Sequence, residues 1–166
     1  KLQAVLDRKG EVETLANIFY SRNDIFFIGR GLDSCVSYEG SLKLKEVSYI
    51  NSLAITAGEL KHGTIALVED DTLIFALASQ DFLFEKMLSN IEEVKTRGAR
   101  VVGIAKKSQN AIQSKADEVI FIPDCADEIT PLLTVVPLQL FAYYVAKRRG
   151  TNVDKPKNLA KSVTVE

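Results

Sequence analysis

The stretch Leu73-Ile74-Phe75-Ala76-Leu77-Ala78 decides the fold class, because it is apolar at every position rather than at every second one. Similar short apolar runs occupy residues 25–28, 101–104 and 119–122. Continuous runs of this length are typical of strands buried on both faces, as in a parallel sheet. A weaker run at residues 52–56 predicts one more strand, which makes about five.

Helical patterns separate these runs. A first apolar stripe consists of Val5, Val12, Leu15, Ala16 and Phe19, and a second consists of Phe84, Met87, Ile91 and Val94, followed by Gly98 as a C-cap. The last predicted helix runs from about residue 127 to residue 149 and ends at Gly150. Strands that alternate with helices predict an α/β doubly wound domain with helices on both faces of the sheet.

Length and composition limit the functions that the chain can have. With 166 residues, 46% of them hydrophobic, the chain is long enough to bury the core of one domain. Lys and Arg number 21 against 22 Asp and Glu, so the basic field that nucleic acids and anionic membranes need in a partner is missing. Cys35 and Cys125 are far apart and form no CxxC pair, which favours a reducing cytosol over a disulfide framework or a zinc site.

The ends of the chain suggest how it is organised. It begins with Lys1 rather than Met, so we expect a piece of a longer protein. Residues 1–150 are predicted to form one domain, and residues 151–166, with Pro156 and many charges, a C-terminal tail. The apolar stretch 129–146 contains two prolines and falls short of the ~20 apolar residues that a membrane span needs, so we interpret it as a buried helix.

Two loops follow predicted strands, where ligands of doubly wound sheets bind. They are Gly29-Arg30-Gly31, which leads into a helix near residue 32, and Ser79-Gln80-Asp81. A glycine turn at a helix N-terminus can hold an anion on free backbone N–H groups. The dinucleotide pattern is incomplete, because Ser34 stands where a third glycine belongs, and a tight turn without a ligand explains the loop equally well.

The helix after this loop carries an acid–base–acid row. At 100° per residue Glu39, Lys43 and Glu46 fall on one side of the helix, with apolar residues at its ends and flanks. Such rows are usually solvated ion pairs, and spacing alone favours that interpretation. The alternative is a partly buried acid/base set with shifted pKa values.

Two further residues are candidates on chemical grounds. His62 is the single histidine and lies between Gly58 and Gly63, which let a backbone approach a ligand closely, although a lone histidine is most often a surface or structural residue. No second histidine or carboxylate cluster has metal-ligand spacing, so no metal is expected. Lys161 has apolar neighbours, with Lys157 nearby, and could form an imine; an ordinary tail lysine would look the same.

Four segments together resemble a known family. Residues 39–50, 57–63, 136–140 and 157–166 closely resemble the glucosamine-6-phosphate synthases, also called glutamine–fructose-6-phosphate aminotransferases (isomerizing). The resemblance covers essentially the whole chain and matches the second sugar-isomerase (SIS) subdomain at the carboxyl end of those enzymes. It implies a three-layer α/β/α fold with a flavodoxin-like parallel sheet.

The resemblance implies a role for each matching residue. Lys161 matches the lysine that forms a Schiff base with the open-chain sugar, and Glu46 the carboxylate that moves a proton between C1 and C2. Lys43 and Glu39 match their polar partners on the same helix, with Glu39 contacting substrate. His62 matches the histidine linked to ring opening in the neighbouring subunit, and Ala160, beside Lys161, is the other expected substrate contact. No cofactor is implied.

The resemblance also implies what surrounds this chain. The family makes glucosamine 6-phosphate from fructose 6-phosphate and glutamine-derived ammonia, so the implied partners are a glutaminase domain, a first SIS subdomain that grips the hexose 6-phosphate, and a second subunit in a cytoplasmic homodimer. Ser79-Gln80-Asp81 resembles a degenerate form of the phosphate loop, so we expect the chain alone to be almost inactive. Leu53 and Lys157 depart from a usual acid and a usual arginine. A phosphosugar-sensing module and a related sugar-amine deglycase or isomerase remain alternatives.

Overall fold

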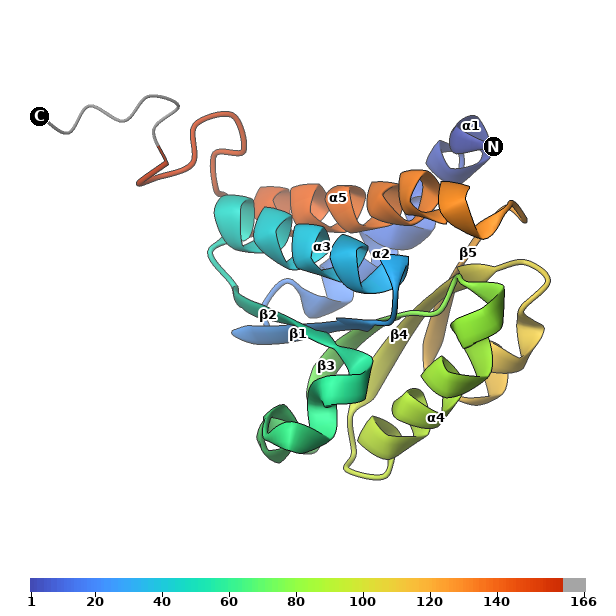
Figure 1. Ribbon diagram of the computed structural model, residues 1–166. Coiled ribbons are helices and arrows are strands. Elements are labelled where there is room, and N and C mark those ends of the chain that lie inside the picture. The colour runs from blue at the N-terminus through green and yellow to red at the C-terminus, as the bar shows by residue number, and fades with distance from the viewer. Residues whose placement is uncertain (160–166) are drawn as a thin grey trace, which may run out of the picture.

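The computed structural model describes residues 1–159 and has one five-stranded sheet (Figure 1). All neighbouring strands are parallel, in the order β2-β1-β3-β4-β5. This confirms the predicted α/β class and the weaker fifth strand. The strands are β1 (Asp24–Gly29), β2 (Asn51–Thr56), β3 (Leu73–Leu77), β4 (Arg100–Lys106) and β5 (Glu118–Ile122).

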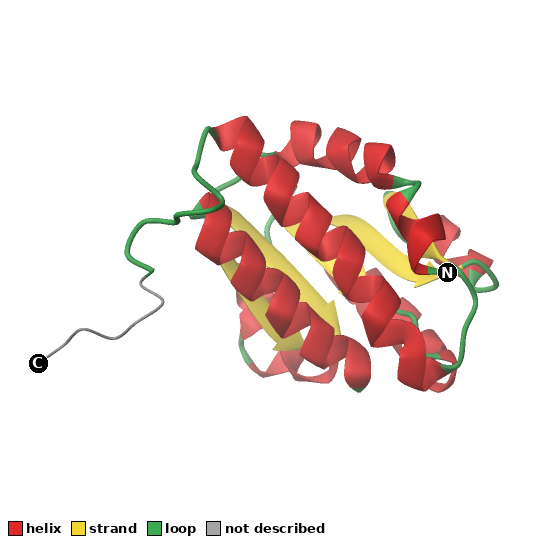
Figure 2. Ribbon diagram, turned by 90° about the horizontal axis from the view of Figure 1, so that it is seen from above, coloured by secondary structure: helices red, strands yellow, loops and turns green. Residues whose placement is uncertain are grey.

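Helices cover both faces of the sheet, as Figures 1 and 2 show. On one face lie α2 (Lys9–Phe19), α3 (Leu32–Ser48) and α5 (Thr130–Arg149), and on the other lie α4 (Phe84–Lys95) and the 3-10 segments η1 (Ala57–His62) and η4 (Asn110–Ser114). Each face encloses its own hydrophobic core. A three-layer α/β/α sandwich results.

The first apolar stripe is divided between two helices rather than carried by one. The short α1 (Leu2–Leu6) ends before Arg8, whose backbone leaves the helical conformation at φ −96° and ψ 12°. The Arg8 side chain donates hydrogen bonds to the Phe121 carbonyl at 2.7 Å and to Glu11. This contact with a residue far away in the sequence fixes the break between the helices. A local apolar pattern gives no sign of such a contact.

Burial of the strands follows their place in the sheet. Every residue of the central strand β3 is buried, as the continuous apolar run predicts. Strand β5 has a partner on one side only, and its Val119 and Phe121 are half-buried. The prediction of burial on both faces is therefore incomplete at this edge strand.

The long helix α5 belongs to the core. By length and composition, residues 127–149 could cross a membrane, but half of the most apolar window is buried inside the fold. Phe141 of this helix packs on Phe75 of β3 with ring centroids 4.6 Å apart, and Phe75 stacks on Phe27. We therefore interpret α5 as a core helix, in agreement with the sequence.

The sheet topology places the two candidate loops side by side. The strand order reverses between β1 and β3, which pair directly in register. The loops that follow these strands therefore both leave the sheet at the C-terminal ends of its strands, at the switch in strand order. This is where this class of fold binds its ligands.

Candidate functional site: the strand-order switch and the charged row of α3

The two loops at the switch in strand order contact each other. The backbone N–H of Leu32, at the start of α3, donates to Gln80 Oε1 at 2.8 Å. The buried carboxylate of Asp33 accepts hydrogen bonds from Ser79 N at 2.7 Å and from Ser79 Oγ at 2.6 Å. The N-terminus of α3, which the sequence suggested for an anion, is thus bonded to side chains and backbone of the chain itself.

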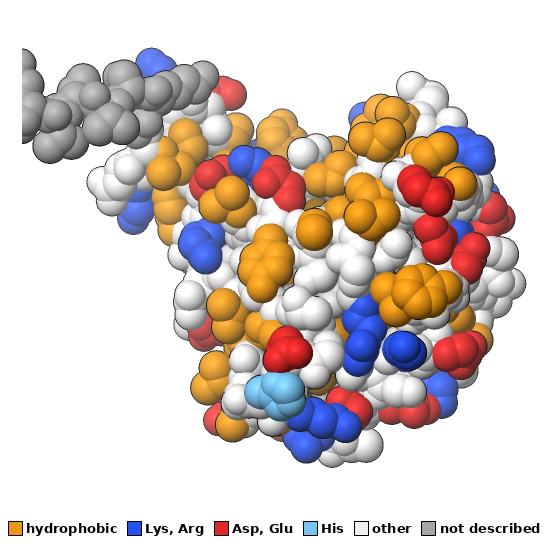
Figure 3. Space-filling model, in the orientation of Figure 1, with side chains coloured by type: hydrophobic (Ala, Val, Ile, Leu, Met, Phe, Trp, Pro, Cys, Tyr) orange, Lys and Arg blue, Asp and Glu red, His pale blue; other side chains and the backbone are white. Residues whose placement is uncertain are grey.

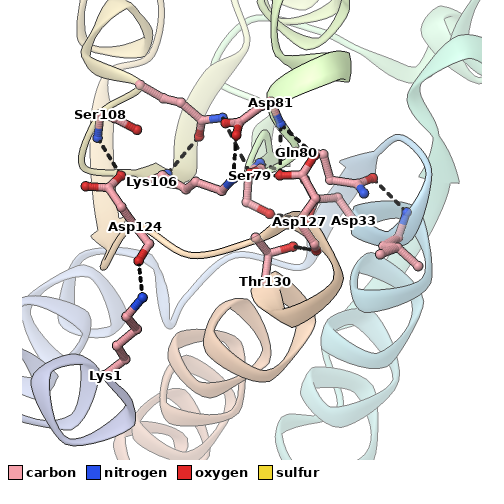
Figure 4. A network of polar contacts seen from close by, with 12 residues as sticks. Lys1, Asp33, Ser79, Gln80, Asp81, Lys106, Ser108, Asp124, Asp127 and Thr130 are labelled. Atoms are coloured by element: carbon pink, nitrogen blue, oxygen red, sulfur yellow. Dashed lines mark hydrogen bonds and ion pairs between the residues drawn. The ribbon is translucent and has the colours of Figure 1, made fainter.

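A buried lysine extends this network toward β4 (Figure 4). The Lys106 side chain is 2% exposed, and its Nζ lies 2.6 Å from Asp127 Oδ1 and 3.0 Å from Asp81 Oδ2. Gln109 Nε2 donates to Asp81 Oδ1 at 3.0 Å. The polar groups that would meet a ligand at this edge are therefore engaged with one another.

The pKa values of this network have opposing causes. Burial raises the pKa of Asp33, against the hydrogen bonds from Ser79 that lower it. Burial would lower the pKa of Lys106, but the hydrogen bonds to Asp127 and Asp81 outweigh it and the pKa is raised. Burial likewise opposes ionisation of Asp127, yet the Lys106 hydrogen bond holds its pKa below the ordinary value. Lys106 and Asp127 therefore form a charged pair at neutral pH.

The acid–base–acid row lies on α3 as the spacing predicts. Lys43 Nζ is 2.9 Å from Glu46 Oε2 and 3.7 Å from Glu39 Oε1. The three side chains are between 29% and 38% exposed, so they are neither buried nor freely solvated. The hydrogen bond to Glu46 is the main reason that the pKa of Lys43 is raised, against a smaller effect of burial. Lys43 is accordingly a fixed cation beside a carboxylate.

His62 lies on a different element from this row. It ends η1, and its Nδ1 is 2.7 Å from Glu59 Oε2, with the imidazole side chain 72% exposed. Figure 3 shows the histidine on the same face of the molecule as charged side chains over α3, but apart from them. Among the described residues, the structure brings Glu39, Lys43 and Glu46 together and does not bring His62 to them.

The segment that carries His62 is anchored to α4. Lys61 Nζ lies 2.7 Å from Glu93 Oε1, and Arg30 donates to Asn90, which in turn donates to Glu93. Although burial opposes it, the hydrogen bond from Lys61 lowers the pKa of Glu93. An ion pair of the residue next to His62 thus links this segment to α4.

Two predicted site residues, Ala160 and Lys161, lie outside the described residues. The tail before them, residues 151–159, contacts the end of α3 through two hydrogen bonds. Thr151 Oγ1 donates to the Val47 carbonyl at 2.6 Å, and the backbone N–H of Lys157 donates to the Tyr49 hydroxyl at 2.8 Å.

Sequence reasoning did not find Lys106, Asp127 or Asp33. The position of each residue next to a predicted element is a weak sequence signal. Lys106 follows an apolar run, and Asp33 and Asp127 lie at the start of predicted helices. What decides their importance is the meeting of four segments at one sheet edge, which no local pattern shows. In residues 1–159 no group of three or more His, Cys, Asp or Glu residues could hold a metal ion.

Comparisons with known proteins agree with this architecture. The family model described as SIS domain matches residues 18–147, and the chain belongs to that family. Its sequence is 61% identical, over all 166 residues, to a glutamine–fructose-6-phosphate aminotransferase [isomerizing] of Caldanaerobacter subterraneus subsp. tengcongensis, and the match covers 27% of that relative. The resemblance inferred from the motifs is confirmed. The chain spans about a quarter of the length of the curated relatives it matches.

Two solved structures share the fold of this chain. The C-terminal domain of glucosamine-fructose-6-phosphate aminotransferase from Francisella tularensis superposes with a TM-score of 0.85 at 35% identity, covering 93% of this chain and 43% of that one. A glucosamine-6-phosphate deaminase from Thermotoga maritima gives a TM-score of 0.70 at 26% identity, covering 96% of this chain and 48% of that one. In both, the present chain matches slightly less than half of the structure.

Proposed function

We propose that the chain is the C-terminal part of the isomerase domain of a glutamine–fructose-6-phosphate aminotransferase (isomerizing). The observation that carries this proposal is the 61% identity to such an enzyme along the entire chain. The whole protein then converts fructose 6-phosphate and glutamine-derived ammonia into glucosamine 6-phosphate, for amino-sugar synthesis in the cytoplasm.

The row on α3 has a chemical use in this reaction. The Lys161 amine condenses with the C2 carbonyl of the open-chain ketose and water leaves; ammonia must then displace the lysine for an amino sugar to form. Glu46 takes a proton from C1 and returns it to C2, and the proton of the C1 hydroxyl passes to the imine nitrogen, which completes the change from ketose to aldose. Lys43, held as a cation 2.9 Å from Glu46, orients that carboxylate, and Glu39 contacts the sugar.

This chain supplies only part of such a site. The anion-binding groups at its own strand-order switch are bonded internally, so the sugar phosphate needs another subdomain to hold it. A first SIS subdomain and a glutaminase domain in the same protein are the proposed partners, and the relatives are long enough to contain both. The exposed His62 on its anchored segment is suited to reach the site of a second subunit in a homodimer.

Borohydride trapping tests the role of Lys161. In the full-length protein, Lys161→Ala is expected to abolish covalent trapping of labelled fructose 6-phosphate, because the imine can no longer form. Lys155→Ala, a change of an exposed lysine in the same tail, is the matched control and is expected to trap normally. Trapping that persists at another lysine in Lys161→Ala rejects the assignment.

Solvent exchange tests the role of Glu46. We expect Glu46→Gln to slow exchange of the C1 proton of bound fructose 6-phosphate with solvent by roughly 10²- to 10⁴-fold, the usual contribution of a general base, while sugar binding persists. Glu85→Gln, on the exposed side of α4, is the control. Exchange at the wild-type rate in Glu46→Gln excludes this carboxylate as the base.

A related sugar-amine deaminase is the second candidate, favoured by the 26% identity to the Thermotoga maritima enzyme. The two activities differ in their need for glutamine. Product analysis of the full-length protein with and without glutamine separates them: glutamine-dependent glucosamine 6-phosphate supports the synthase, and release of ammonia from glucosamine 6-phosphate without glutamine supports the deaminase.

A further inference from the structure

Helix α3 ends on an unusual residue. Tyr49, its C-cap, has φ 61° and ψ 20°, the left-handed conformation that glycine and asparagine adopt most easily at this position. A bulky residue held there is strained, and such strain points to a role for the side chain. What the tyrosine contacts is therefore informative.

The Tyr49 side chain holds one residue of the C-terminal tail at two points. Its hydroxyl oxygen accepts a hydrogen bond from the backbone N–H of Lys157 at 2.8 Å. Its ring faces the Lys157 ammonium, which lies 4.4 Å from the ring centroid, within the range of a cation–π interaction. Since Lys157 is otherwise exposed, this tyrosine is its main attachment among the described residues.

The beginning of the tail is attached to the same end of α3. The Thr151 hydroxyl donates to the carbonyl of Val47, in the last turn of the helix. Val153 lines an open surface pocket of about 140 Å³ together with Lys43 and Val47. The chain between these anchors is folded locally, with Asn152 Oδ1 accepting the N–H groups of residues 154 and 155.

Both residues of this contact are close in sequence to residues with a proposed catalytic role. Tyr49 follows Glu46 by one turn of α3, and Lys157 precedes Lys161 by four residues. Four extended residues span at most about 14 Å, so fixing Lys157 limits how far from the end of α3 the Lys161 amine can react.

We propose that Tyr49, through its hydrogen bond and ring contact with Lys157, is a positioning residue that holds the C-terminal tail so that Lys161 meets the acid–base row of α3. This inference rests on the proposed function. Tyr49 touches no reacting atom in this scheme; it restricts the tail before the amine is used, which lowers the entropy lost when the imine forms.

The test uses the full-length protein and three changes around this contact. Tyr49→Phe removes the hydroxyl and keeps the ring, Lys157→Ala removes the ammonium and keeps the backbone N–H, and Lys157→Arg keeps a cation. We expect Tyr49→Phe to slow borohydride trapping of fructose 6-phosphate three- to tenfold, the effect of about one hydrogen bond. Lys157→Ala should slow it two- to threefold, and Lys157→Arg should restore the wild-type rate.

Two further readouts separate positioning from general stability. Hydrogen exchange at the Lys157 amide is expected to accelerate in Tyr49→Phe, while the melting temperature and the KM for glutamine stay at wild-type values. Tyr20→Phe is the matched control, since this tyrosine also carries a cation over its ring, from Arg148 at 5.1 Å, at the end of α2. It should trap at the wild-type rate.

The outcomes distinguish this inference from the proposed function. If Lys161→Ala still traps the sugar, the imine assignment fails and the positioning role fails with it. If Lys161→Ala abolishes trapping but Tyr49→Phe and Lys157→Ala both trap at the wild-type rate, the proposed function stands and the role of Tyr49 is rejected. Slower trapping that accompanies a lowered melting temperature in Tyr49→Phe also rejects it.

Discussion

Lys106 shows how one residue connects distant parts of this fold. Its backbone ends the buried strand β4, and its ammonium binds Asp127 ahead of α5 and Asp81 after β3. Because only 2% of the side chain is exposed, the ammonium has little access to water beyond these two partners. Burying an ammonium is costly unless it is paired, so the two carboxylates are necessary for the lysine to lie there at all.

Replacing this lysine should be costly at neutral pH. Lys106→Met keeps the volume but leaves the Asp127 carboxylate without its cation. Removing one partner of a fully buried pair costs about 3–5 kcal/mol; since Asp81 is 69% exposed and Asp127 is 25% exposed, we expect a loss of about 2 kcal/mol in the free energy of unfolding. Urea unfolding at pH 7 measures it. Lys107→Met, the exposed neighbour, is the control, and equal losses in both variants would contradict the account.

The same pair predicts a pH dependence. The pKa of Asp127 is lowered in the folded protein, so its contribution is present above the ordinary Asp pKa of about 3.9 and is lost as the pH falls through the lower folded value. Lys106→Met lacks this contribution, and the difference in unfolding free energy between wild type and variant should shrink below about pH 4. A difference that stays constant down to the acid limit of folding would show that the pair is not its source.

At the scale of elements, α3 and α5 pack closely at Gly40. A Cβ atom added to Gly40 would lie 2.6 Å from Leu138 Cδ1, and Leu138 is itself 1% exposed with little room to move. Gly40→Ala gains up to about 1 kcal/mol in helix propensity but overpacks this contact at a cost of about 1–3 kcal/mol, so we expect net destabilisation.

Thermal unfolding of Gly40→Ala beside Gly10→Ala measures this effect. Gly10 lies in α2, and an added Cβ there meets nothing within 4 Å, so Gly10→Ala should stabilise the chain by about 0.5 kcal/mol. The double variant Gly40→Ala/Leu138→Ala should lose less than the sum of its single changes. A stabilised Gly40→Ala variant would show that the two helices separate easily.

Elements were predictable wherever a local pattern determines them. The apolar runs located β1, β3 and β4, because a strand covered on both faces must be apolar throughout, and they also located β5, although this edge strand is only partly buried. The break between α1 and α2 was not predictable, since it depends on a hydrogen bond from Arg8 to Phe121, a residue of the edge strand β5 that is far away in the sequence. The row on α3 followed from helical periodicity alone, while the left-handed turn at Tyr49 carries no local signal such as glycine.

At the scale of the whole molecule, the strand-order switch was predictable as a location but not in its content. The topology rule places a site where β1 and β3 separate, and Gly29-Arg30-Gly31 and Ser79-Gln80-Asp81 do meet there. The side chains that occupy this location are those of Gln80, Lys106 and Asp127. They come from separate segments, and their pairing is a property of the folded chain. Residue roles that the family resemblance implies, such as that of Lys161, stay predictions.

The groups at the strand-order switch are bonded to one another, and this has a consequence for the chain by itself. Because the start of α3 and the neighbouring loop bond to each other, the 166-residue chain should neither bind fructose 6-phosphate saturably in calorimetry nor form glucosamine 6-phosphate from it with glutamine or ammonia. The full-length protein, under the same conditions, should do both. Substantial product from the chain alone would overturn the need for a second SIS subdomain. Saturable binding by the chain, with a full-length protein that performs no chemistry, would instead favour the phosphosugar sensor, since binding would then be the whole function of the fold.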